Sequence, residues 1–407
     1  MNVESREQIP GLDQLRVAAG RELDNILHWW SSNMVDHANG GFYGRIDGYG
    51  RLHPEADKGV ILNTRILWTF SAAARMTGER HYRDLAERAY DYVTRYFADE
   101  EFGGVYWTVD FKGNPAESKK QVYAQAFAVY ALAEYYLSSN NPAALESAQS
   151  IFEQIERHSR DRVKGGYFEA FSRDWSALGD LRLSDKDANE AKTMNTHLHL
   201  LEAYTTLYQA WPDAEVREAL ADLTGLFLDT FIDPDTAHLH LFFDENWVSK
   251  SDKISFGHDI ETAWLLMDAA ETLGDPVLTA RARAAAVHIA DRTIAEGYDP
   301  ANGGLWNEAD AQGLSDCDKE WWPQIEAVVG FLRVWQNTGE PRFAAAALRS
   351  WSFIEKHLPD PENGEWFWGL KADGTPNRAQ DKAGLWKCPY HNSRGCMEIL
   401  SLLRPVL

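Results

Sequence analysis

The chain of 407 residues is 44% hydrophobic and 25% charged, so it can bury a sizeable core. Its 40 Lys and Arg residues against 62 Asp and Glu residues give a formal net charge of −22, which argues against nucleic acids and anionic membranes as partners. No apolar run approaches the roughly 18 residues of a membrane span, the N-terminal segment lacks an export pattern, and the three cysteines lack CxxC spacing, so we expect a cytoplasmic protein with free thiols.

A glycine pair followed by aromatic, apolar and acidic residues recurs along the chain. Copies begin at Asn39, Phe102, Lys164, Asn302 and Asn363, and a degenerate copy that begins at Ala237 fills the long gap. The starts fall roughly every 60 to 70 residues, and a unit of that size is too small to fold alone. The spacing therefore predicts six stacked units that bury a shared core.

Pairs of stretches with helical periodicity lie between successive motifs. Residues 63–78 and 118–139 are apolar or aromatic on nearly every face, as in buried inner helices, whereas the stretches that follow them, 80–97 and 142–159, carry a charged stripe. Twelve helices in six such hairpins predict an all-α fold, a single (α/α)6 barrel with short β-strands and loops at the active-site end. No Pro-, Gly- or Ser-rich linker interrupts the pattern, so we expect residues 1–407 to form one catalytic domain.

Polar clusters interrupt four of the predicted inner helices, and in such a barrel they would meet at one mouth. In chain order the clusters contain Arg65, then Asn195, His197 and His199, then His258 and Glu261, then Trp386 and His391. Asn195 and His199 are four positions apart and share one helix face. The same holds for His258 and Glu261, which are three positions apart. The rings of His197 and His199 lie about 200° apart on a helix, so we predict that His199 faces the axis and that His197 is structural.

Several functions compete for these side chains. A single histidine on an apolar helix is commonly a hydrogen-bonded core residue, but several on separate helices weaken that interpretation. Histidines beside a glutamate could bind zinc, yet no HExxH pattern occurs and the acidic residues are spread over the barrel, so we predict no metal. A glycosidase, which needs two carboxylates about 5 to 9 Å apart, and a noncatalytic sugar-binding barrel stay open.

Imidazoles suit reactions that invert a carbon centre. They titrate near neutral pH, so two of them on opposite sides of a substrate can exchange the roles of proton acceptor and donor. A C–H bond next to a carbonyl can be broken if the resulting enediolate is stabilised, and Arg65 with a third imidazole could stabilise its oxygen charge. Such a reaction requires no cofactor.

Five ordered motifs between residues 62 and 399 resemble the N-acylglucosamine 2-epimerase superfamily, and most closely its cellobiose 2-epimerase branch: LNTRILWTFSAA, AKTMNTHLHLLEAYT, FGHDIETAWLL, EWWPQIEAVVGF and WKCPYHNSRGCMEI. The resemblance implies an (α/α)6 barrel that interconverts the C2 epimers of the reducing-end aldose of a β-1,4-linked disaccharide, such as cellobiose and 4-O-β-glucosyl-mannose. It implies two-histidine proton transfer through a ring-opened cis-enediolate, without metal or nucleotide. The expected partner is a small-molecule sugar, and the expected state is a monomer or a weak homodimer.

The resemblance also assigns roles to residues. His258 and His391 would remove and return the C2 proton on opposite faces, and His199 would assist ring opening. Glu261 would orient His258. The residues that it implies in substrate binding are Arg65, Tyr123, Asn195, Glu261, the stacking platforms Trp322 and Trp386, and, in the outer pocket, Asp187 and Glu308. Asn307 stands where family members have an aromatic residue, which is a departure near the second sugar.

Two related activities use the same groups. A mannose 2-epimerase, or an isomerase that converts mannose or glucose to fructose, would act on a monosaccharide. Protonation of the enediolate at C2 yields an epimer and protonation at C1 yields a ketose, so the product depends on the placement of the donor. The motifs favour the disaccharide branch over a nucleotide-dependent N-acylglucosamine epimerase.

Overall fold

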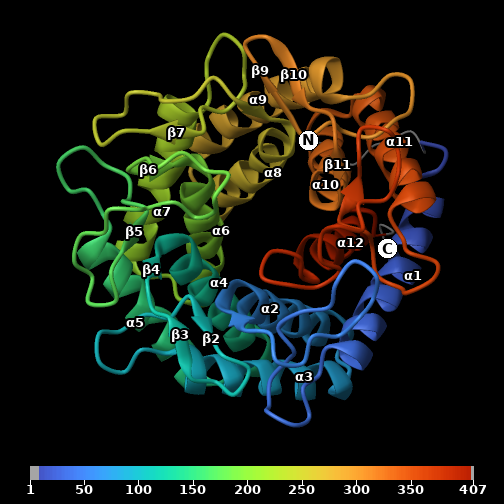
Figure 1. The fold of residues 1–407 in the computed structure, drawn as a ribbon. Helices are drawn as coiled ribbons and strands as arrows, with labels where there is room; N and C mark the ends of the chain where they lie inside the picture. The colour runs from blue at the N-terminus through green and yellow to red at the C-terminus, as the bar shows by residue number, and fades with distance from the viewer. Residues whose placement is uncertain (1–8, 405–407) are drawn as a thin grey trace.

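The computed structural model describes residues 9–404, in which helices form an inner and an outer ring around one axis (Figure 1). The inner helices are α2 (Val60–Thr77), α4 (Val122–Ser139), α6 (Met194–Ala210), α8 (Phe256–Leu273), α10 (Trp321–Thr338) and α12 (Tyr390–Leu402). The outer helices are α1 (Leu12–Asn33), α3 (Arg80–Tyr92), α5 (Pro142–His158), α7 (Ala214–Leu226), α9 (Pro276–Arg292) and α11 (Pro341–His357). Helices α3, α7 and α9 continue into the π-helical turns η1 (Val93–Phe97), η2 (Phe227–Phe231) and η3 (Thr293–Gly297). The predicted all-α (α/α)6 barrel is confirmed.

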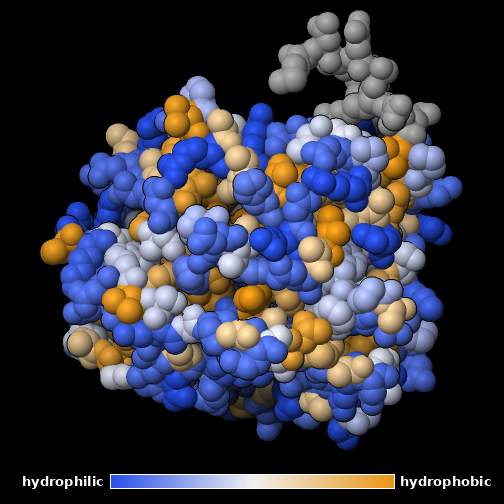
Figure 2. Space-filling view, turned by 90° about the horizontal axis from the view of Figure 1, so that it is seen from above, coloured by the Kyte–Doolittle hydropathy of each residue, from blue (hydrophilic) through white to orange (hydrophobic). Residues whose placement is uncertain are grey.

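Burial separates the two rings as the hydrophobic pattern predicts. In the inner helix α4, residues 122–135 are all buried, whereas the outer helix α3 buries Leu85, Ala86, Ala89 and Tyr92 along one stripe. The side of the barrel seen in Figure 2 is accordingly mostly hydrophilic, with hydrophobic residues scattered over it. Within residues 9–404, none of the helices combines the length and the apolar character that a membrane crossing requires.

Short strands lie at the end of the barrel where the inner helices begin. They are β1 (Lys58–Gly59), β2 (Thr108–Val109), β3 (Pro115–Glu117), β4 (Lys120–Gln121), β5 (Ala170–Phe171), β6 (Lys192–Thr193), β7 (Phe242–Phe243), β8 (Ile254–Ser255), β9 (Glu308–Asp310), β10 (Gly313–Asp316), β11 (Lys319–Glu320) and β12 (Gly369–Leu370). The strand before each of the helices α2, α4, α6, α8 and α10 pairs antiparallel with a strand that follows the glycine motif of the next unit. Each unit is thereby joined to its neighbour at the mouth.

A buried ion pair recurs with the glycine motif. The aspartate that precedes the glycines accepts a hydrogen bond from the lysine ammonium that precedes the inner helix, in the pairs Asp36–Lys58, Asp99–Lys120, Asp161–Lys192, Asp299–Lys319 and Asp360–Lys382. In four units this lysine lies two residues before the inner helix, and in the degenerate unit Ile254 occupies that position and His238 instead bonds Asp259. A buried charge is tolerated only where it is paired. Each aspartate and lysine must therefore stay together, and this holds the mouth loop against the start of the inner helix.

The two ends of the chain close the ring. The last inner helix, α12, packs against the first outer helix, α1, to complete the sixth hairpin. A β-bridge between Ile46 and Ala383 joins the first mouth loop to the last, and the indole of Trp30 donates to Glu365. Every inner helix therefore presents its first turns to one common mouth.

Candidate active site

A cavity of about 290 Å³ opens at this mouth, and every inner helix contributes to its wall. All but one of the predicted site residues line it: Arg65, Tyr123, Asp187, Asn195, His199, His258, Glu261, Trp322, Trp386 and His391. A second cavity of about 180 Å³ shares Asp187, Asn195, His258 and Trp322 with the first and extends to Glu308, the remaining predicted residue. The structure therefore brings all the predicted residues into one cleft with an inner and an outer part.

The three imidazoles of the inner cavity are each held through Nδ1. His199 Nδ1 lies 3.0 Å from Glu202 Oε2, His391 Nδ1 lies 2.8 Å from Glu326 Oε1, and His258 Nδ1 lies 2.8 Å from Ser255 Oγ. A carboxylate partner requires a hydrogen on Nδ1, so Nε2 of His199 and of His391 carries the lone pair. In residues 9–404 no protein group bonds Nε2 of any of the three rings, so it is available to a substrate.

Trp322 lies against both histidines of the predicted proton-transfer pair. Its ring centroid is 4.7 Å from that of His258 and 5.6 Å from that of His391. Burial is the largest influence on these imidazoles, and it lowers the pKa of His258 to about 3 and that of His391 well below its usual value. Burial also lowers the pKa of His199, so the three rings are neutral at neutral pH, and His199 and His391 present a lone pair on Nε2.

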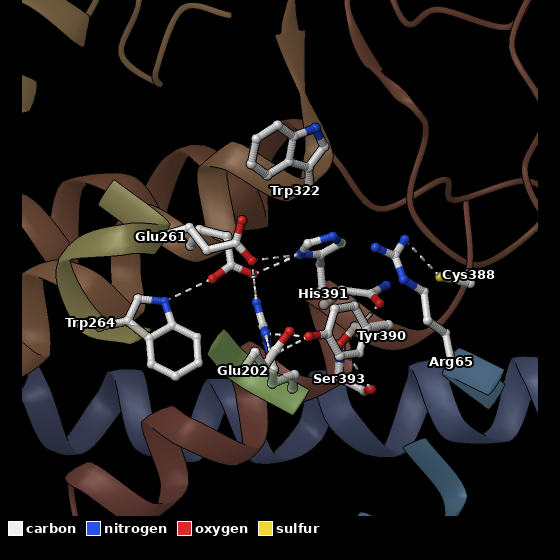
Figure 3. Close-up of polar contacts among 12 residues, drawn as sticks. Arg65, Glu202, Glu261, Trp264, Trp322, Cys388, Tyr390, His391 and Ser393 are labelled. Carbon is white, nitrogen blue, oxygen red and sulfur yellow. Dashed lines mark hydrogen bonds and ion pairs between the residues drawn. The ribbon is translucent and has the colours of Figure 1, made fainter. Parts of the chain in front are cut away.

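A buried charge network that includes Glu202 and Glu261 lies beside His391 (Figure 3). Arg394 donates to Glu202, to Glu261 Oε1 at 2.7 Å and to Glu326 Oε1 at 2.7 Å, and the Tyr390 hydroxyl also donates to Glu202. Each of these side chains is at most 4% exposed. One guanidinium thus balances carboxylates from three other inner helices at the barrel axis.

The prediction that Glu261 orients His258 is wrong in this structure. Glu261 lies one turn below His258 and bonds Arg394 across the axis, while Ser255 holds His258. Burial raises the pKa of Glu261 to about 8, and burial also raises that of Glu326. We assign the proton to Glu261, because Glu326 accepts hydrogen bonds from Trp264, His391 and Arg394. Glu261 Oε2 is buried without a protein partner, so it can bond a substrate hydroxyl.

Arg65 is a buried cation without an anionic partner. One terminal nitrogen donates to the Tyr123 hydroxyl at 2.7 Å, and the guanidinium lies 4.2 Å from the ring centroid of Phe127 and 4.9 Å from that of Tyr390. Among the described residues no carboxylate forms an ion pair with it, although its side chain is 3% exposed. A buried, unpaired guanidinium at the wall of a cavity is suited to stabilise negative charge that forms on a bound molecule.

The remaining predicted residues fall into two groups. Tyr123 and Trp386 pack together on the wall of the inner cavity, with ring centroids 6.2 Å apart, and the side-chain oxygen of Asn195 is buried there without a partner. In the outer cavity Glu308 lies 3.5 Å from Lys253. Asp187 accepts from both the backbone N–H and the hydroxyl of Ser184, which orders the loop between the two cavities.

His197 is structural, as its helical position predicts. Its Nδ1 lies 2.7 Å from the carbonyl oxygen of Thr193, and its Nε2 accepts from the backbone N–H of Tyr167 at 2.9 Å. Because Nδ1 donates and Nε2 accepts, both nitrogens of this ring are occupied. Asn307 lies in the outer cavity, where it donates to Asp316 at 2.9 Å, so the wall of this cavity is polar at that position.

Glu261, Glu326 and His391 could together hold a metal ion, because one ligand atom of each lies within 4.8 Å of the others. The geometry fits a cation poorly. Arg394 already bonds both carboxylates, and Nδ1 of His391 must carry a hydrogen to bond Glu326. A metal ion here would also face the guanidinium charge at close range.

The sequence interpretation did not single out Glu202, Glu326, Arg394, Trp368 or Glu320. A repeated spacing marks Glu202 and Arg394. Each of His199, His258 and His391 is followed three positions later by a charged residue. That spacing places the charged residue one turn deeper on the same helix face. Glu326 follows Trp322 by four positions, which places it in the same way. No comparable signal marks Trp368, which enters from a loop.

Comparison with known proteins agrees with the family resemblance. The family model described as N-acylglucosamine 2-epimerase (GlcNAc 2-epimerase) matches residues 41–394. A cellobiose 2-epimerase of Bacteroides fragilis is 49% identical over 375 residues, which cover 92% of this chain and 95% of that protein. One of Ruminococcus albus is 40% identical, with 93% and 96% covered. The crystal structure of a sugar epimerase from a ruminal bacterium matches with a TM-score of 0.92 at 38% identity and covers 96% of this chain and 100% of that chain.

Proposed function

We propose, from the premise that this chain belongs to the N-acylglucosamine 2-epimerase family and to its cellobiose 2-epimerase branch, that it interconverts the C2 epimers of the reducing-end aldose of a β-1,4-linked disaccharide. The observation that carries the proposal is the arrangement of His199, His258 and His391. Each ring is fixed through Nδ1 and keeps Nε2 for a substrate, in a cavity that also holds the unpaired guanidinium of Arg65. Proton transfer at carbon needs such neutral imidazoles and a cation for the enediolate.

The proposed reaction begins with ring opening. His199 Nε2 accepts the proton of the anomeric hydroxyl, the C1–O5 bond breaks, and the proton passes to O5, which gives the open-chain aldose. One of His258 and His391 then removes the C2 proton, and the charge that develops on O1 faces Arg65. The other imidazole enters this step as the imidazolium, a form that the negative charge of the enediolate stabilises, and it delivers its Nε2 proton to the opposite face of C2, so the two rings end with their protonation states exchanged. Glu261 Oε2, which carries the proton assigned to that carboxyl, is positioned to donate to a substrate oxygen, and the Asn195 side-chain oxygen is positioned to accept from a substrate hydroxyl.

The cleft favours a disaccharide over a monosaccharide. The outer cavity continues from the inner one past Trp322 and offers Asp187, Asn307 and Glu308 to a second sugar. Carboxylate and amide groups of this kind bind sugar hydroxyls. A mannose 2-epimerase, or a mannose or glucose–fructose isomerase, would leave that outer cavity without a role. The cytoplasmic location, the monomeric or weakly dimeric state and the single domain of residues 1–407 stay predictions.

Incubation with cellobiose, mannose and glucose in D2O, followed by NMR, tests the proposal. We expect 4-O-β-glucosyl-mannose from cellobiose, with deuterium at C2 of the product, because an imidazole proton exchanges with solvent before it returns to carbon. Fructose from mannose or glucose would indicate the isomerase, and free glucose from cellobiose a hydrolase. A C2 epimer without solvent deuterium would contradict the enediolate.

Treatment with EDTA is expected to leave the rate of epimerisation unchanged within about twofold. The reason is that imidazoles and a guanidinium supply the proton transfers and the charge stabilisation, so no step needs a Lewis acid. Initial rates before and after dialysis against EDTA, with a buffer-dialysed sample as control, provide the measurement. A loss that added zinc restores would contradict the prediction.

A further inference from the structure

Glu320 bonds two indoles that come from different units of the barrel. Its Oε2 accepts the indole N–H of Trp322 and its Oε1 accepts that of Trp368, each at 3.0 Å. Glu320 ends strand β11 directly before helix α10, and its side chain lines both the inner and the outer cavity. A single carboxylate between the two cavities thus fixes two aromatic rings.

The backbone brings Trp368 to this carboxylate by close approach of two strands. Glu320 pairs with Gly369 between β11 and β12, and a Cβ atom on Gly369 would lie 2.4 Å from the carbonyl oxygen of Lys319. Only glycine fits there without displacing backbone. Trp368, the residue before this glycine, is therefore held beside Glu320.

Trp322 is held at both ends of its ring system. Its N–H is bonded to Glu320, and a Cβ atom on Gly257 of helix α8 would lie 2.6 Å from its six-membered ring. Between these points the ring lies against His258 and His391. The second indole, Trp368, reaches His391 indirectly. Its ring centroid is 4.6 Å from that of Trp321, and the ring centroid of Trp321 is 6.4 Å from that of His391.

The chemistry of the contact requires a carboxylate. Two N–H donors need two acceptor oxygens, and glutamine offers one oxygen and an NH2 group that would face the second donor. Trp322 and Trp368 are both partly exposed, so packing alone does not fix their rotation, in contrast to the buried Trp321, whose N–H has no partner. We propose that Glu320 is a positioning residue, which orients Trp322 and Trp368 and through them the two imidazoles that transfer the C2 proton. This role rests on the proposed function.

A double-mutant cycle tests the proposal. In E320Q we expect kcat for cellobiose epimerisation to fall about ten- to hundredfold, with a smaller change in KM, because misplaced reacting groups slow the chemical step. In a W368F background one donor is gone and the glutamine oxygen can serve Trp322 alone. E320Q should then cost less than about threefold relative to W368F, which is the non-additivity that a shared contact produces. Equal cost in both backgrounds, or an unchanged kcat in E320Q, would overturn the proposal.

The matched control is E340Q. Glu340 also directly precedes a helix, the outer helix α11, but it pairs with Arg342 on the surface. The kcat of E340Q should match that of the wild type.

If E320Q does not fold, W322F removes the donor instead, and a kcat within threefold of wild type would contradict the proposal. If the wild type itself does not turn over cellobiose, the proposed function fails, and near-UV circular dichroism still decides the role of Glu320. A spectrum of E320Q that differs from E340Q supports the orientation of the indoles, and an identical one overturns it.

Discussion

Replacement of His391 by Asn is expected to lower kcat for C2 epimerisation by about 10²- to 10⁴-fold, the range that one general acid or base contributes. Asparagine keeps a donor for Glu326 but has no lone-pair nitrogen that could take a proton from carbon. The H258N variant should lose a similar factor. Initial rates with cellobiose provide the measurement, and circular dichroism should show an unchanged fold.

A second measurement separates two bases from one. If His258 and His391 act on opposite faces of C2, each variant keeps one base, so it should still exchange the C2 hydrogen of one epimer with D2O and not that of the other. H258N and H391N should exchange opposite epimers. His240, which lies 3.3 Å from Asp233 and away from the cavity, provides the control H240N with expected wild-type turnover. Exchange of both epimers in a single variant would contradict the two-face assignment.

The barrel and the polar clusters on its inner helices could be predicted from the sequence because both follow from periodicity, whereas Tyr123, Trp322, Asp187 and Glu308 are implied only by the family resemblance. The glycine motif recurs once per unit, and the helical period places Asn195 and His199 on one face and His197 on the other. These are local rules that need no knowledge of which helices meet. Four of the aspartate–lysine pairs obey the same repeat, and an alignment of the units would reveal them.

The charge network could not be predicted because it depends on contacts across the axis. Glu261 is nearest to His258 along its own helix, and local spacing therefore suggests that pair. In the structure the guanidinium of Arg394, from helix α12, is the stronger partner for a buried carboxylate. Which of four inner helices face each other is set by the closure of the ring, and a single sequence without aligned relatives does not reveal it.

Replacement of Arg394 by Met should produce the largest loss of stability. It removes the cation that serves Glu202, Glu261 and Glu326, and a buried pair that loses one partner costs about 3 to 5 kcal/mol of unfolding free energy. Urea unfolding at about pH 7.5 provides the measurement. The control is R342M, because Arg342 pairs with Asp291 on the surface with half its side chain exposed, and such pairs contribute about 0 to 1 kcal/mol.

The loss of stability in R394M should also depend on pH, and the direction of that dependence shows whether uncompensated charge or lost packing causes it. Burial raises the pKa of Glu202 but Arg394 and its other partners lower it to about 2 against an ordinary value of 4.5, so in the wild type this group adds stability above pH 4.5 that is lost as the pH falls toward 2. Without Arg394 the pKa of Glu202 rises, and the pKa values of Glu261 and Glu326, which burial raises and the guanidinium lowers, rise further, so the folded variant holds more protons near neutral pH than the folded wild type. On acidification from about pH 7.5 to 5 the stability of R394M should therefore rise more than that of the wild type, and the difference in stability between the two should narrow. A gap that stays constant would show that lost packing, and not the uncompensated carboxylates, causes the destabilisation.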